Sequence, residues 1–165
     1  MDQIIAYFSE ISSIHRGLIL AGGITFFWIL EFSLPATKFQ YNKWNHAAIN
    51  FFFTGTTIIV NFCMAFLLLL TANWTMQNNF GLLNWLPELN IWLYTIIGLL
   101  LLDFIGAYLA HLVQHKTAWM WRFHLIHHTD TWIDTTTANR HHPGESVIRF
   151  VFTVFGVFLL GTPMW

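Results

Sequence analysis

The chain has 165 residues, of which 56% are hydrophobic, 18% aromatic and only 9% charged. This composition is too apolar for an ordinary soluble domain and favours a membrane protein. The formal net charge is -1 and no cluster of Lys and Arg occurs, which excludes nucleic acid as a partner because its binding requires a basic patch.

The N-terminal region is predicted to lie on the membrane surface. Residues 4–14 place apolar side chains at helical spacing with polar residues between them, which is typical of an amphipathic interfacial helix. Residues 17–35 form an apolar run close to the about 20 residues that cross a bilayer, and Pro35 is expected to end it. The N-terminus lacks a basic segment and a cleavage site, so we expect no removable signal peptide.

Three further apolar segments are predicted to cross the membrane. The second runs from about Ala47 to Ala72, which is longer than a span needs, so we expect it to be tilted. The third runs from about Ile91 to Ala110, and the fourth is "SVIRFVFTVFGVFLLGTP" over residues 146–163. The linker at 73–90 is rich in Asn and Trp, which favours an interfacial loop or short helix.

The distribution of basic residues predicts the orientation of the spans. Because cytoplasmic loops carry an excess of Lys and Arg, the segments after the first and third spans are predicted to be cytoplasmic. The basic residues of these segments are Lys38, Lys43, Lys116, Arg122 and Arg140, whereas residues 73–90 contain none.

These observations predict the fold class and the location. Only helices satisfy every backbone group within a short apolar segment, so we expect an all-α protein. We expect an integral membrane bundle of about four transmembrane helices in a single domain over 1–165, with an N-terminal interfacial helix and a cytoplasmic histidine-rich helical cap. A compact chain with little outside the spans fits a bacterial inner membrane better than the endoplasmic reticulum.

A histidine-rich segment, "HLVQHKTAWMWRFHLIHHTD", follows the third span. His111 and His115 are four residues apart, so on a helix they lie one turn apart on the same face. His124, His127 and His128 repeat this spacing at i, i+3 and i+4. The connection "KTAWMWRF" is short enough to let a second helix turn back beside the first. Five imidazoles are therefore predicted to converge just below the bilayer.

Such a concentration of neutral imidazoles predicts a metal site. Imidazole binds Zn, Fe, Cu and Ni, and several uncharged bases are tolerated together only when they share a cation or a proton. The alternative is an interfacial cluster that responds to pH. His15 and His46 each lie alone at a span end and are interpreted as interfacial residues rather than ligands.

Three motifs resemble the fatty acid hydroxylase and sterol desaturase superfamily, whose members are membrane di-iron enzymes. They are "DFIGAYLAHLVQH", "WRFHLIHHTD" and "TTTANRHHPGE", in the family's order and at similar spacing. His141 occupies a position where the family usually has an aromatic or aliphatic residue. Carried over residue by residue, the resemblance implies these metal ligands: His111, His115, His124, His127, His128 and His142.

The resemblance also implies a reaction. Family members use two iron ions (Fe2+/Fe3+) and O2 to hydroxylate or desaturate a C–H bond of a membrane lipid, such as a fatty acyl chain or a sterol. Zinc could occupy the same ligands but could not activate O2. No flavin, haem or nicotinamide motif occurs in the chain, so electrons are expected from a separate carrier of the cytochrome b5 or ferredoxin type.

One departure from the family leaves a second hypothesis open. The family continues to a further histidine box, whereas this chain has no histidine after His142. We therefore expect either a truncated enzyme of lipid biosynthesis, or a non-catalytic metal-binding membrane protein or inactive fragment. A transporter is disfavoured because its ligands would lie near the middle of the bilayer.

Four acidic residues are candidates for supporting roles. Asp103 lies inside the third span, about 12 Å along the helix from His111 at about 1.5 Å per residue. An intramembrane carboxylate suggests a function, and it is expected either to pair with Asn50 or Asn61 or to support the metal site indirectly. The remaining acids are expected to orient ligating histidines by accepting their second N–H, with helix capping as an alternative for the last: Asp130, Asp134 and Glu145.

Overall fold

The structure is a computed structural model that describes residues 7, 10–34, 41–87 and 89–162. All regular structure in this part of the chain is helical. Four helical segments are long and apolar enough to span a membrane: 14–33, 43–77, 91–116 and 143–160. The predicted all-α bundle of about four spanning helices is therefore confirmed. The predicted interfacial helix at 4–14 lies largely outside the described residues.

The first two spans begin at polar N-caps. In α2 (Ser13–Ser33), the Ser12 hydroxyl accepts a hydrogen bond from the His15 N–H at 3.2 Å. In α3 (Lys43–Gln77), the Asn42 side chain accepts from two backbone N–H groups at 3.1 Å. The 35 residues of α3 extend beyond both ends of the predicted second span, and at roughly 1.5 Å per residue they exceed the hydrocarbon thickness.

The third span is one continuous helix of three parts. α4 (Ile91–Asp103) is followed by the π-helical segment η1 (Phe104–Leu109) and then by α5 (Ala110–Lys116). The Asn90 side chain caps the start of α4 by accepting from Trp92 N–H at 2.9 Å. The periodicity of apolar residues in the third span did not predict the π segment, which lies just before the histidine pair of α5.

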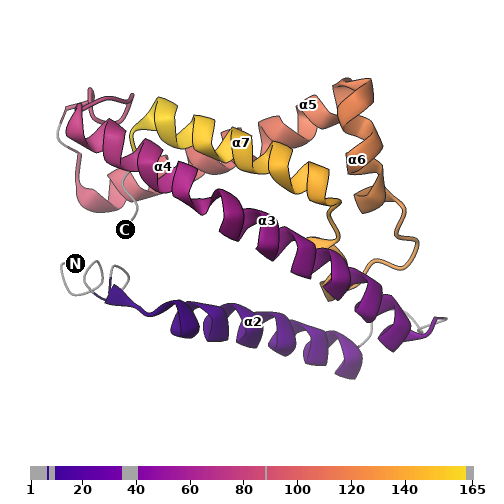
Figure 1. Ribbon diagram of the computed structural model, residues 1–165. Helices are drawn as coiled ribbons and strands as arrows, with labels where there is room; N and C mark the ends of the chain where they lie inside the picture. The colour runs from indigo at the N-terminus through magenta and orange to yellow at the C-terminus, as the bar shows by residue number, and fades with distance from the viewer. Residues whose placement is uncertain (1–6, 8–9, 35–40, 88, 163–165) are drawn as a thin grey trace.

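A single extended residue, Thr117 (φ -112°, ψ 110°), ends α5, and α6 (Ala118–His128) starts directly after it. The chain turns there, so that α5 and α6 form a corner at one end of the bundle (Figure 1). The short 3-10 helix η2 (Thr135–Asn139) follows, and α7 (Pro143–Leu160) returns through the bundle beside α3. The predicted linker "KTAWMWRF" is thus mostly the first turns of α6.

The interior of the bundle is small, and most large apolar side chains face outward. A core of Leu83, Ile105 and Leu160 lies between the third span, α7 and the preceding loop. Outward-facing side chains include Phe62, which is 82% exposed on α3. A surface of this kind is expected where lipid, and not water, surrounds the helices.

Two glycines hold the loop at residues 78–87 against the end of α7. Gly81 and Gly161 both have positive φ, at 127° and 71°. A Cβ added at Gly81 would overlap the Gly161 Cα, because the two backbones are in contact. Leu82 and Leu83 donate their N–H groups to the carbonyls of residues 159 and 160 at 2.9 and 3.0 Å.

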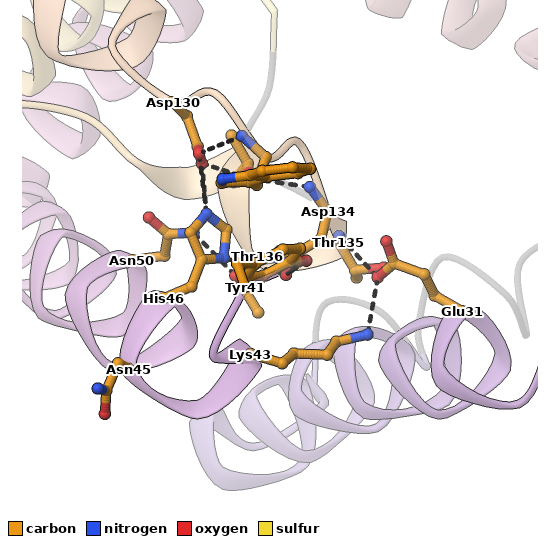
Figure 2. A network of polar contacts seen from close by, with 12 residues as sticks. Glu31, Tyr41, Lys43, Asn45, His46, Asn50, Asp130, Asp134, Thr135 and Thr136 are labelled. Atoms are coloured by element: carbon orange, nitrogen blue, oxygen red, sulfur yellow. Dashed lines mark hydrogen bonds and ion pairs between the residues drawn. The ribbon is translucent and has the colours of Figure 1, made fainter. Parts of the chain in front are cut away.

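A polar network ties the first two spans to the segment that carries η2 (Figure 2). On the α2 side, Glu31 Oε2 accepts hydrogen bonds from the backbone and the hydroxyl of Thr135 at 3.1 and 2.9 Å. The same oxygen lies 3.6 Å from the Lys43 ammonium at the start of α3. Glu31 is therefore the link between α2, α3 and η2.

On the α3 side, the imidazole of His46 lies between two carboxylates (Figure 2). Its Nε2 is 2.9 Å from both oxygens of Asp130, and its Nδ1 is 3.1 Å from Asp134 Oδ2. Tyr41 donates its hydroxyl to Asp134 at 3.0 Å, and Asn50 donates to the Thr136 hydroxyl at 2.9 Å. The interpretation of His46 as an isolated interfacial residue is wrong, because this ring is the centre of a network between distant segments.

Gly81→Ala is expected to destabilise the protein by at least about 2 kcal/mol, because the new methyl group would collide with the backbone at Gly161. The control is Gly55→Ala on α3, where an added Cβ meets nothing within 4 Å. Unfolding by SDS titration in mild detergent measures both. Equal stability of the two variants would contradict the described contact.

His46→Ala is expected to lower the free energy of unfolding by about 2 kcal/mol or more, because it leaves two carboxylates without their shared partner. Tyr41→Phe removes a single hydrogen bond and is expected to have a smaller effect of about 1 kcal/mol. The control is His15→Ala, an exposed histidine on α2. The same titration measures all three, and a His46 variant as stable as the control would refute the role of the network.

Candidate metal centre

Two helices each contribute two histidines to one point. His111 and His115 lie one turn apart on α5, and His124 and His128 lie one turn apart on α6. The break at Thr117 turns α6 so that its pair faces the pair on α5. The predicted return of the second helix is what brings the pairs together.

The four rings converge on their Nε2 atoms. His115 Nε2 lies 3.0 Å from His111 Nε2 and 3.1 Å from His128 Nε2. His128 Nε2 also lies 3.0 Å from His124 Nε2. One nitrogen from each ring lies within 4.8 Å of every other, so a single ion could contact all four. Histidine pairs of this spacing on two facing helices are a common way of building such a site.

A buried carboxylate sets the orientation of one of these rings. Glu145 on α7 and His124 on α6 both have fully buried side chains, and Glu145 Oε1 lies 2.8 Å from His124 Nδ1. The Nδ1–H that donates to the carboxylate leaves the lone pair of Nε2 for the cluster. Glu145 also lies in the first turn of α7, which suits its charge.

The other predicted ligands separate into two environments. His127 stacks on His141 with ring centroids 5.1 Å apart, and His141 Nδ1 lies 3.0 Å from Glu145 Oε1. His142 instead caps α7, because its Nδ1 accepts a hydrogen bond from Gly144 N–H at 3.0 Å. The structure thus brings His141, and not His142, against the other histidines.

Burial favours the uncharged, ligating form of two rings. Burial lowers the pKa of His124, although the hydrogen bond to Glu145 acts in the opposite direction. Burial, together with the neighbouring His141, lowers the pKa of His127. A lowered pKa favours the neutral form of both rings, which is the form that binds metal.

The donor atoms fit a transition metal. Four imidazole nitrogens suit Zn, Fe, Cu or Ni and not Mg or Ca, which prefer oxygen. Next to them, the buried Nδ1 of His127 and Oε2 of Glu145 have no hydrogen-bond partner among the described residues. Buried polar atoms without a partner are unfavourable, so these two atoms are available as ligands for a cation.

Two of the predicted supporting acids lie elsewhere. Asp130 and Asp134 contact His46, which is not one of the four clustered histidines. Burial alone would raise the pKa of Asp134, but hydrogen bonds from Thr136 and Tyr41 outweigh it and lower that pKa. These acids therefore hold the segment between α6 and α7 in place, and do not orient the cluster directly.

The intramembrane acid has neither of its expected asparagine partners. Asn50 donates to Thr136 and accepts from Arg140, in the network below the cluster. Asp103 lines a cavity together with Asn61, but within the described part of the chain no hydrogen bond or ion pair joins them.

The sequence interpretation missed the role of His46 in the polar network. One signal for it was the i, i+4 spacing of His46 and Asn50, which places both residues on one face of α3.

Comparison with known proteins places the histidine segment in a family. The family model described as fatty acid hydroxylase matches residues 95–165, which include all the histidines of the site. The ornithine lipid hydroxylase OlsE of Rhizobium tropici is 29% identical over 69 residues, which are 42% of this chain. The match spans only 20% of that relative's length. No solved structure matches the chain at a significant level.

The family match and the geometry agree on the same part of the chain. The matched residues include most of the third span, the corner of α5 and α6, and α7, which together carry the four-histidine cluster and Glu145. Over residues 95–165, the chain therefore matches the fatty acid hydroxylase family at the segment that carries its histidine cluster.

Proposed function

We propose that the protein is a membrane lipid oxidase that uses two iron ions and O2 to hydroxylate or desaturate a C–H bond. The observation that carries this proposal is the convergence of four imidazoles within 4.8 Å in the segment that matches the fatty acid hydroxylase family. Bound iron would supply the activation of O2 that an unactivated C–H bond requires.

The chain's own residues have distinct roles in this proposal. His111, His115, His124 and His128 would hold one ion, and Glu145 fixes the tautomer and orientation of His124. His127, His141 and Glu145 would supply ligand atoms for a second ion. His142 holds the start of α7, which keeps Glu145 in position.

The reaction needs a substrate and electrons that the chain does not itself supply. In hydroxylation, one oxygen atom enters the C–H bond and the other leaves as water, with two electrons and two protons from outside. Desaturation removes a second hydrogen in place of adding oxygen. We propose a carrier of the cytochrome b5 or ferredoxin type as the electron source. The relative that hydroxylates ornithine lipid supports a membrane lipid, and a bacterial one, as the substrate.

The proposed orientation places the histidines on the cytoplasmic face of a bacterial inner membrane. The basic residues at the histidine end of the bundle support it, because such residues favour the cytoplasmic side. In the described part of the chain they are Lys43, Lys116, Arg122 and Arg140.

Loss of a clustered histidine is expected to lower metal affinity at least about tenfold, because each supplies one of four converging nitrogens. The variants are His124→Ala and His128→Ala, with His15→Ala as the control because that exposed ring lies on α2. Elemental analysis of iron and zinc per chain, on protein purified in mild detergent, measures the effect. Equal metal content in all three variants would count against the assigned centre.

Lipid oxidation is expected in cells that produce the chain together with a suitable electron carrier. Mass spectrometry of extracted lipids should show species that gain one oxygen atom or lose two hydrogens. His128→Ala should abolish these products, because it removes a nitrogen of the cluster. Bound iron without any such product would favour the alternative of a non-catalytic metal-binding protein.

A further inference from the structure

A cavity of about 520 Å³ lies between α3, the third span and α7. Leu99, Leu102 and Phe150 provide part of an apolar wall. The remainder of the lining is polar for a segment that spans a membrane, and it includes Asn61 and Asp103, both exposed at the open side of the cavity. A slot that received only an acyl chain would have no use for such groups.

Two opposite charges face this cavity without pairing. Asp103 comes from the third span and Arg149 from α7, and both line it. Within the described part of the chain, no ion pair or hydrogen bond joins the two charged groups to each other or to a third side chain. Charged side chains inside membrane spans are costly and usually have a partner. The missing partners therefore point to a ligand.

The cavity adjoins the histidine centre. His141 lines it and also stacks on His127, with ring centroids 5.1 Å apart. Arg149 lies within electrostatic range of His111. Ser146 and Thr57, whose hydroxyl oxygens are 2.9 Å apart, close the wall between α3 and α7. A molecule in the cavity would thus lie beside the rings.

The two charges select among lipid classes. A sterol or a bare acyl chain would leave both charges unsatisfied. An anionic headgroup would suit Arg149 but would be repelled by Asp103. A headgroup with both an ammonium and an anionic group satisfies both through charge-assisted hydrogen bonds.

We propose that this cavity binds the headgroup of a zwitterionic lipid, with its ammonium group at Asp103 and its carboxylate or phosphate at Arg149. The inference rests on the proposed function, in which a membrane lipid is the substrate, and it names the class of that lipid. It also assigns Asp103 and Arg149 as residues that determine specificity.

Native mass spectrometry of the purified chain, mixed in turn with three lipids, tests the inference. Ornithine lipid and phosphatidylethanolamine are zwitterionic, whereas phosphatidylglycerol carries only a negative charge. At least one zwitterion is expected to bind about tenfold or more tightly than phosphatidylglycerol. The better zwitterion identifies a carboxylate or a phosphate as the partner of Arg149. Equal binding of all three lipids would overturn the inference, and this comparison needs no variant.

Substitutions assign the selectivity to the two charges. Asp103→Asn should remove the preference over phosphatidylglycerol, and Asp103→Glu, which keeps the charge, should retain it. Arg149→Gln should weaken binding of all three lipids, because each has an anionic group. The control is Arg122→Gln, an exposed residue of α6. A preference that survives in a folded Asp103→Asn variant would refute the assignment.

Metal content and lipid oxidation, measured with the same preparations, separate this inference from the proposed function. Selective lipid binding without oxidation would overturn the proposed function and leave the headgroup site standing. Oxidation without selective binding would overturn the headgroup site and leave the proposed function standing.

Discussion

The buried hydrogen bond between His124 and Glu145 is the contact on which the histidine centre depends. Both side chains are fully buried, and one comes from α6 and the other from α7. A carboxylate placed there without a donor would be strongly unfavourable, so the start of α7 must lie beside the end of α6. Because Glu145 Oε1 also lies 3.0 Å from His141, one buried group organises both sets of histidines.

The histidine pairs were predictable because their spacing is local. Four residues make about one helical turn, so His111 with His115 and His124 with His128 share faces whatever the tertiary structure. The spans were predictable from hydropathy, except that α3 continues to Gln77, because no Gly or Pro interrupts the helix after Ala72. Contacts between distant segments were not predictable. His46 and Asp130 are 84 residues apart, and nothing local links them.

The positions of His141 and His142 depend on a detail of capping. The family resemblance implies His142 as a ligand, whereas an N-cap side chain turns back to the first backbone N–H groups of its helix. His142 does so, and the neighbouring His141 is then directed toward Glu145.

The two halves of the chain have separate roles. Residues 95–165 carry the histidine centre, while α2 and α3 support the segment between α6 and α7 through Glu31 and His46.

The π-helical segment η1 lies between Asp103 and the first histidine. A π turn adds one residue to a helix, which rotates everything after it by about 100° relative to a regular α-helix. The π turn therefore sets the angle about the helix axis between Asp103 and the face of α5 that carries the histidines. A chain without this extra residue could keep every one of these side chains and still direct its histidines to a different side of the third span.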